Sequence, residues 1–216
     1  MTITTVIFDF GGVITTSPFD AFNRFEAERG FLKNVIRRIN ATNPNNNAWA
    51  LFERNEIDAA QFDELFAAEA AARKHMIRGS EVLALLSGDI RPRMVETLDT
   101  LKAKGFTLGC ITNNVQTGSG AGMAGSSSKA AAIAAIMARF DYVIESSKAG
   151  IRKPDPRIYT MMCDALGVAP EACIYLDDLG INCKPAAAMG MIAIKVEGED
   201  QALAALDNAL GHILSA

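Results

Sequence analysis

Residues 5–13 read Thr-Val-Ile-Phe-Asp-Phe-Gly-Gly-Val, and this stretch decides the fold. The apolar run in residues 5–8 is rich in β-branched side chains and too short for a helix, so it predicts a buried strand. Asp9 follows that strand directly. A carboxylate beside a buried strand destabilises the fold unless it is paired, bound to a cation or used in chemistry. Asp9 is therefore the first candidate functional residue.

Comparable apolar runs recur along the chain with helical stretches between them. They span residues 106–111, 142–144, 173–176 and 191–196. Helix signals fill the gaps, because Pro92 can open a helix that Gly105 ends, and Asp155 with Pro156 can cap one that stops at Gly167. This alternation predicts an α/β fold with a doubly wound, Rossmann-like and mostly parallel sheet.

Residues 17–88 depart from the alternation, because they contain helix signals only. Phe19, Phe22 and Phe25 fall at helical spacing, and residues 58–61 resemble a capping box that leads into an alanine-rich helix. We expect a small helical cap domain, residues 17–88, inserted after the first strand of an α/β core domain made of residues 1–16 and 89–216. Ligands of open α/β sheets bind at the carboxyl ends of the strands, so this insertion is placed to cover them.

Polar residues follow two other predicted strands where each strand ends. Thr112 and Asn113 follow the second strand, and Asp177 and Asp178 follow the fourth. The carboxyl ends of parallel strands meet at one edge of a sheet, so these carboxylates are expected to crowd around Asp9. Crowded carboxylates favour a divalent cation, and a set of oxygen ligands suits Mg²⁺ better than zinc.

Lys153 lies in a loop, within residues 150–155, and supplies the positive charge that these carboxylates lack. Beside a magnesium ion, a lysine can hold a phosphoryl group while charge shifts in the transition state. Thr112 and Asn113 can donate hydrogen bonds to the remaining phosphoryl oxygens.

Four motifs in order carry a resemblance to a known family. Residues 8–13, 111–114, 152–159 and 176–182 resemble the four motifs of the haloacid dehalogenase-like hydrolase superfamily. Residues 183–191 look most like the branch that contains the N-terminal phosphatase domain of soluble epoxide hydrolase. Glucose-1-phosphate phosphatases are relatives with a similar first motif. The helical cap of this family, inserted after the first motif, matches the predicted insertion.

The resemblance implies a set of roles for individual residues. Asp9 would be the nucleophile that forms an aspartyl phosphate, and Lys153 would contact both this nucleophile and the phosphate. The remaining implied roles are metal binding by Asp9, the Gly11 carbonyl, Asp178 and Asp177, support of the metal by Asn182, and phosphate binding by Gly12, Thr112 and Asn113.

One position departs from the phosphatases of the superfamily. They usually carry a second aspartate two residues after the nucleophile, where this chain has Gly11. That aspartate protonates the leaving group and activates water, and general acid–base catalysis contributes typically ~10²–10⁴-fold to a rate. We therefore expect a Mg²⁺-dependent phosphatase that acts on a small phosphate monoester with a good leaving group, such as a sugar phosphate.

Three alternatives remain open. The chain could be a catalytically weak protein of the same fold that binds a phosphorylated ligand or a partner through its cap. Haloacid dehalogenases also lack the second aspartate, but they usually continue with Tyr-Gly-Thr, which residues 10–12 do not match. Residues 120–125 form a G-x-G-x-x-G, with Glu145 twenty residues after Gly125, but Gly120 lies eight residues beyond Thr112, too far from the strand for a dinucleotide fingerprint.

The composition of the chain narrows the classes of molecule that it could bind. The chain has 216 residues, 50% of them hydrophobic, and a net charge of −4, which gives no electrostatic reason to bind nucleic acid. Residues 1–4 lack the basic start of a signal peptide, and no apolar run approaches the roughly 18 residues of a membrane span. We expect a cytoplasmic protein whose partner is a small phosphorylated metabolite, without nucleic acid or membrane. Its four cysteines show no C-x-x-C spacing, so buried thiols are favoured over a zinc site.

Overall fold

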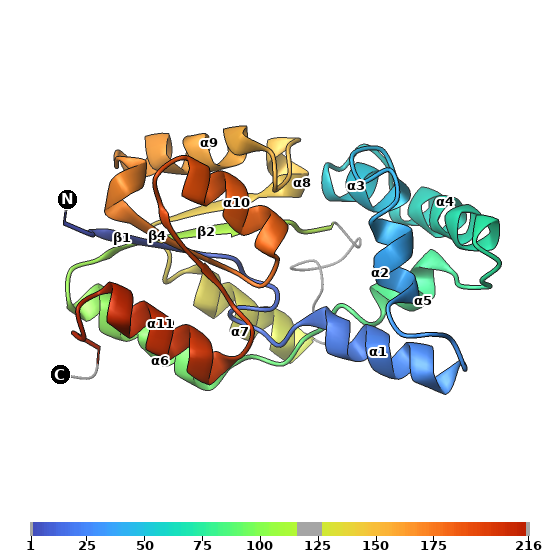
Figure 1. The fold of residues 1–216 in the computed structure, drawn as a ribbon, viewed down its shortest axis with the longest axis horizontal. Coiled ribbons are helices and arrows are strands. Elements are labelled where there is room, and N and C mark those ends of the chain that lie inside the picture. The colour runs from blue at the N-terminus through green and yellow to red at the C-terminus, as the bar shows by residue number, and fades with distance from the viewer. Residues whose placement is uncertain (1, 116–126, 215–216) are drawn as a thin grey trace.

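The computed structural model describes residues 2–115 and 127–214, and a five-stranded sheet lies at its centre (Figure 1). All five strands are parallel, in the order β3-β2-β1-β4-β5. They are β1 (Thr5–Phe8), β2 (Thr107–Thr112), β3 (Tyr142–Glu145), β4 (Cys173–Asp177) and β5 (Ile192–Lys195). The predicted α/β fold class is confirmed, and each strand falls on one of the predicted apolar runs to within a residue or two.

Helices cover both faces of the sheet (Figure 1). One face carries α6 (Pro92–Ala103), α7 (Ser127–Met137) and α11 (Glu199–Ala209), and the other carries α8 (Ser146–Ala149), α9 (Pro156–Leu166) and α10 (Gly180–Ala188), with a short 3₁₀ helix, η1 (Pro170–Ala172), before β4. The helix signals acted as predicted: Pro92 opens α6, and the Asp155 carboxylate caps α9, which ends at Gly167 in the left-handed conformation.

The strands read as continuous apolar runs because both faces of the sheet are buried. Phe8 packs into the cluster beneath α6, α7 and α11, whereas its neighbour Ile7 packs into the cluster beneath α9 and α10. The same alternation separates Leu176 from Tyr175 in β4. Side chains of a strand point to opposite faces in turn, so a strand covered by helices on both sides has no polar face.

Five helices follow β1, and no strand lies among residues 17–88, as predicted. They are α1 (Pro18–Glu28), α2 (Val35–Asn40), α3 (Ala48–Glu53), α4 (Ala59–Ala72) and α5 (Gly79–Leu83). Their aromatic residues share a hydrophobic cluster, in which the rings of Phe52 and Phe62 stack with centroids 4.9 Å apart. The capping box is present, because Asp58 and Gln61 each accept a hydrogen bond from the other's backbone N–H.

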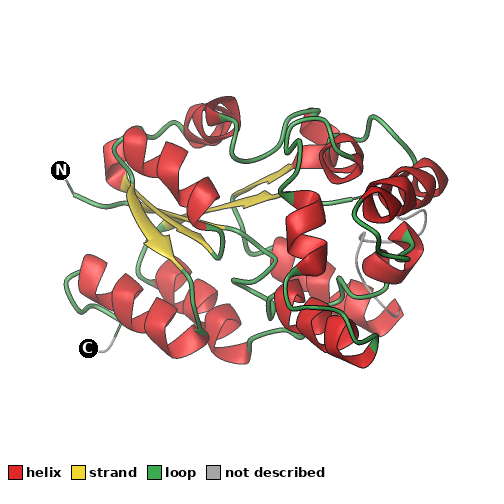
Figure 2. Ribbon diagram, turned by 45° about the vertical axis from the view of Figure 1, so that its right-hand side comes forward, coloured by secondary structure: helices red, strands yellow, loops and turns green. Residues whose placement is uncertain are grey.

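These helices lie beyond the carboxyl ends of the strands (Figure 1), and a turned view also shows sheet and inserted helices on opposite sides of the molecule (Figure 2). The chain leaves the sheet and returns to it at one place, where Thr15 and Ile90 form an antiparallel bridge. The division into a core domain and a cap domain, residues 17–88, stays a prediction.

The four cysteines are buried free thiols. Within residues 2–115 and 127–214, no helix has the length and hydropathy that a membrane span requires. The G-x-G-x-x-G of residues 120–125 lies outside the described residues.

Candidate active site

The predicted site residues meet at one edge of the sheet. Asp9, Thr112 and Asp177 end the neighbouring strands β1, β2 and β4, and all three side chains are buried. A hydrogen bond of 2.8 Å from the Asp9 N–H to the Leu176 carbonyl holds the Asp9 backbone in line with β4. A cavity of about 990 Å³ opens at this edge. Its walls come from the strand ends and from the inserted helices, whose contributions include Phe19, Phe22 and Trp49.

Lys153 reaches into this edge from its loop and is 1% exposed. Its ammonium Nζ lies 2.8 Å from Oδ1 of Asp9 and 2.8 Å from Oδ2 of Asp177. Burial lowers the pKa of Lys153, but the charges of Asp177 and Asp9 outweigh it and raise the pKa above its usual value. Lys153 is therefore a fixed cation beside the nucleophile candidate.

The two adjacent aspartates after β4 have different surroundings. Both oxygens of Asp177 accept hydrogen bonds, from the Tyr175 hydroxyl (2.5 Å), the Leu179 N–H (2.8 Å) and the Asn182 amide (3.1 Å), besides that from Lys153. Asp178 accepts one from the Ser17 hydroxyl (2.9 Å) and no other within the part of the chain that the structure describes. Asp177 thus anchors Lys153, and Asp178 keeps an oxygen available for another ligand.

The carboxylates of Asp9, Asp177 and Asp178 fit a divalent cation. One oxygen from each lies within 4.8 Å of the others. Burial raises the pKa of Asp9 well above its usual range, with Lys153 opposing and the other two aspartates adding to the shift. Burial and the charge of Asp177 raise the pKa of Asp178 to about 6. Three carboxylates face one lysine, so a divalent cation would balance the excess charge, and an oxygen donor set suits Mg²⁺.

The two glycines after Asp9 play different parts. Gly12 has a φ of +78°, and a β-carbon there would overlap the Asp178 carboxylate, so the close approach of the two segments requires glycine. A β-carbon on Gly11 would meet no atom within 4 Å. The position at which the resemblance would place a second aspartate therefore has room for a β-carbon, and Gly11 also lines the cavity.

Thr112 and Asn113, predicted as phosphate ligands, differ in availability. Thr112 is buried and lines the cavity. The Asn113 side chain already bonds the backbone of Lys153 at both ends, since its Oδ1 accepts from the Lys153 N–H (2.9 Å) and its Nδ2 donates to the Lys153 carbonyl (3.0 Å). The Asn113 side chain thus orients the lysine loop, a part that its sequence position did not suggest.

Sequence reasoning missed other residues that shape the site. Ser17 gave no signal for its contact with Asp178, because 161 positions separate the two. Tyr175 has the sequence context of an ordinary core residue of β4. The side chain of Asn114 bonds Glu145 and Ser147, which lie at the end of β3 and just after it. Asn182, predicted as a supporting residue, donates its amide to Asp177.

Comparisons with known proteins identify the family of the chain. A family model described as haloacid dehalogenase-like hydrolase matches residues 3–190. The pig bifunctional epoxide hydrolase 2 is 30% identical over 226 residues, which cover 98% of this chain and 39% of that protein. The chain therefore spans well under half the length of that relative. The resemblances read from the motifs, to the superfamily and to epoxide hydrolase, are confirmed.

Two further proteins are similar over nearly their whole length. Phosphatase MT3486 of Mycobacterium tuberculosis is 29% identical over 215 residues, which cover 93% of this chain and 90% of that protein. The solved structure of a HAD family enzyme from Bacteroides thetaiotaomicron, in complex with magnesium and inorganic phosphate, superposes with a TM-score of 0.59 at 17% identity, covering 92% of this chain and 96% of that one. At that identity the structural likeness shows the shared fold.

Proposed function

This chain belongs to the haloacid dehalogenase-like hydrolases, and we propose that it is a Mg²⁺-dependent phosphatase that cleaves a small phosphate monoester through a phosphorylated Asp9. The observation that carries the proposal is the contact between Lys153 and Asp9 in a buried, cavity-lining position, next to a carboxylate cluster that fits a divalent cation. Two similar proteins support it: one is a phosphatase by name, and the other is a structural neighbour solved in complex with magnesium and inorganic phosphate.

In this proposal, substrate binding uses groups that already line the cavity. The Lys153 ammonium and the Thr112 hydroxyl contact the phosphoryl oxygens, and both are held still by burial. Asp9, Asp178 and the carbonyl of Gly11 would hold Mg²⁺, which supplies positive charge to neutralise the phosphoryl group. Asp177 keeps Lys153 in place through its own hydrogen bonds, and residues 17–88 act as the cap that shields the cavity from water.

The chemistry then needs two displacements at phosphorus. An oxygen of Asp9 attacks the phosphorus, and the bond to the leaving alcohol oxygen breaks. Gly11 has no acid to offer, so the leaving oxygen takes its proton from water. A second water then attacks the phosphorus of the aspartyl phosphate, gives its proton to solvent, and releases phosphate with Asp9 restored. Without a second acid, substrates with good leaving groups, such as anomeric sugar phosphates, react fastest.

The testing experiment is a phosphate-release assay on p-nitrophenyl phosphate and a panel of sugar phosphates, with Mg²⁺ and with EDTA. The proposal requires release that depends on Mg²⁺ and disappears in Asp9→Asn. A panel with no release at all would overturn it. Halide release from 2-chloropropionate in the same buffers would identify a dehalogenase instead, and stabilisation by NAD without metal would identify a dinucleotide protein.

A second candidate is favoured by Gly11 itself. A chain without the second acid can bind a phosphorylated ligand and turn it over slowly or not at all. In that case phosphate esters raise the melting temperature with no phosphate released. A radiolabelled aspartyl phosphate in acid-quenched samples separates the two, because it accumulates when attack by Asp9 outruns hydrolysis.

A further inference from the structure

A partly buried ion pair joins the inserted helices to the loop that carries Lys153. Glu53 is the last residue of α3, and Arg152 directly precedes Lys153. Nε of Arg152 lies 2.5 Å from Oε2 of Glu53, and the two side chains are 20% and 8% exposed. The proposed reaction uses neither charge, so the pair needs another explanation.

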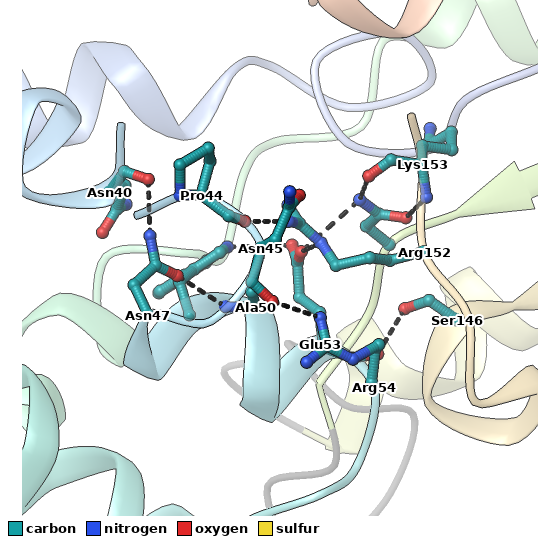
Figure 3. A network of polar contacts seen from close by, with 12 residues as sticks. Asn40, Pro44, Asn45, Asn47, Ala50, Glu53, Arg54, Ser146, Arg152 and Lys153 are labelled. Carbon is teal, nitrogen blue, oxygen red and sulfur yellow. Dashed lines mark hydrogen bonds and ion pairs between the residues drawn. The ribbon is translucent and has the colours of Figure 1, made fainter. Parts of the chain in front are cut away.

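Glu53 lies within a network of polar contacts that also includes Ser146 and Arg152 (Figure 3). Within α3, Nε1 of Trp49 donates to its Oε1 at 2.8 Å. From the sheet side, the Ser146 hydroxyl donates to its carbonyl at 2.7 Å, and Nδ2 of Asn113 lies 3.4 Å from its Oε2. The carboxylate therefore has one defined place between α3 and the strand ends.

Arg152 is attached to the inserted segment at a second point. Its NH1 donates to the Pro44 carbonyl at 3.0 Å, in the turn before α3 (Figure 3). The next residue, Lys153, is held through its backbone by Asn113, which also approaches Glu53. Glu53 is thus connected to Lys153 in two ways. It contacts the side chain of Arg152, the residue before Lys153, and it approaches the Asn113 amide, which bonds the Lys153 backbone.

The burial of the Glu53–Arg152 pair determines how strongly the loss of one partner affects the structure around it. A solvent-exposed pair of this kind contributes little, because water and salt screen it. A buried pair costs much of its attraction in desolvation, but losing one partner strands the other charge in a poorly solvated place. Seating of Glu53 against Arg152 therefore adds a further hold on the loop of Lys153, and Glu53 is itself seated by α3.

We propose that Glu53 and Arg152 are positioning residues for Lys153, through which the seated inserted helices hold the lysine against Asp9. The role rests on the proposed phosphatase function for its effect on rate. In this role the inserted helices help to align the reacting groups, and they also form a wall of the cavity.

The test compares charge-removing variants with a matched control. Glu53→Gln keeps the size and the acceptor for Trp49, and Arg152→Met removes the cation but keeps the length. Arg157→Met removes an exposed arginine five residues along, whose partner is Asp155 and which does not contact the inserted helices. The displaced lysine should lower kcat about 10- to 100-fold in both variants, since small misplacements of reacting groups have effects of that size. The melting temperature should fall in both variants, because each leaves one charge of the pair without its partner, and Arg157→Met should change neither kcat nor KM.

Two further variants complete the kinetic test. The double variant Glu53→Gln/Arg152→Met should be no slower than either single variant, because both remove one interaction. Arg152→Lys keeps a charge and should recover part of kcat. Losses confined to KM, or a fall in melting temperature with kcat unchanged, would show a merely structural pair and overturn the proposal.

A measurement that needs no turnover is the fluorescence emission of Trp49, the only tryptophan of the chain. Its indole bonds Glu53 directly, so Arg152→Met should shift its fluorescence emission, whereas Arg157→Met should not. Thermal stabilisation by inorganic phosphate with Mg²⁺, which needs Lys153 in place, should weaken in Glu53→Gln and Arg152→Met only. If the wild type hydrolyses nothing, the proposed function fails, but these two measurements still decide the positioning role, and unchanged emission and phosphate stabilisation would refute it.

Discussion

Nζ of Lys153 lies 2.8 Å from Oδ1 of Asp9, and both groups are buried at the carboxyl edge of the sheet. The contact favours the carboxylate form of Asp9, which burial by itself would disfavour. In the proposed reaction a nucleophilic carboxylate has to be ionised to attack phosphorus, so the contact with Lys153 would favour the reactive form of Asp9. The second contact of Lys153, to Asp177, holds the ammonium at a second point.

Replacement of the nucleophile should abolish turnover without unfolding the protein. Asp9→Asn keeps the shape of the side chain but cannot form the aspartyl phosphate, so kcat should fall by about 10³-fold or more. Removal of one charge from a crowded cluster should leave the melting temperature equal to that of wild type or higher. Phosphate release and calorimetry check the two statements, and residual activity near the wild-type value would exclude Asp9 as the nucleophile.

Removal of the lysine should destabilise the fold. Lys153→Met leaves Asp9 and Asp177 buried without their cation, and breaking a buried pair in this way costs about 3–5 kcal/mol. Urea denaturation measures the loss. Lys195→Met serves as the comparison, because that lysine is 53% exposed and pairs with Glu197 at the surface, where its removal should change the midpoint far less. Equal effects of the two substitutions would contradict the importance of the buried pair.

Restoring the missing acid should speed turnover. Gly11→Asp adds a β-carbon that meets no atom within 4 Å, at a position that lines the cavity. An acid there would protonate leaving groups, and kcat on esters with poor leaving groups should rise by roughly 10²-fold or more. Gly11→Asn has the same shape without the acid and should show no gain. Identical kinetics of the two variants would mean that the leaving group is protonated from elsewhere.

Gly12 should be required for metal binding. In Gly12→Ala the new methyl group displaces the Asp178 carboxylate, so Mg²⁺ affinity measured by calorimetric titration should fall. The substitution also strains a backbone with positive φ by about 1–3 kcal/mol. Gly30→Ala introduces similar strain, at a φ of +68°, where the methyl group meets no atom within 4 Å. That control should lose stability but bind Mg²⁺ as wild type does.

Magnesium binding should weaken in acid. The pKa of Asp178 in the metal-free protein is raised to about 6, so above pH 6 the carboxylate is free for the cation and below pH 6 a proton competes with it. The contribution of Asp178 to the affinity should therefore level off above pH 6 and decline by up to about tenfold per pH unit below it, and the raised pKa of Asp9 adds to the loss in acid. The Ser17 hydrogen bond lowers the pKa of Asp178, so Ser17→Ala should move the decline to higher pH. Titrations between pH 5 and 8 would show the midpoint, and a flat profile would exclude Asp178 as a ligand.

The amino-acid sequence by itself determined the sheet and the order of the polar groups along its edge. Short β-branched runs, proline and glycine at the helix ends, and the capping box of Asp58 and Gln61 act through neighbours in the chain, so their effects can be read locally. Asp9, Thr112 and Asp177 could be placed together because parallel strands bring their carboxyl ends to one edge.

Only the tertiary structure shows which polar side chains around the site already have a hydrogen-bond or ion-pair partner. It engages both ends of the Asn113 amide with Lys153, sets Ser17 on Asp178, and buries Glu53 against Arg152. Each contact joins segments far apart in the chain, and its strength depends on burial that no local pattern encodes. The sequence therefore predicted which residues gather around Asp9, and the packing of the inserted helices on the sheet determined how they are held.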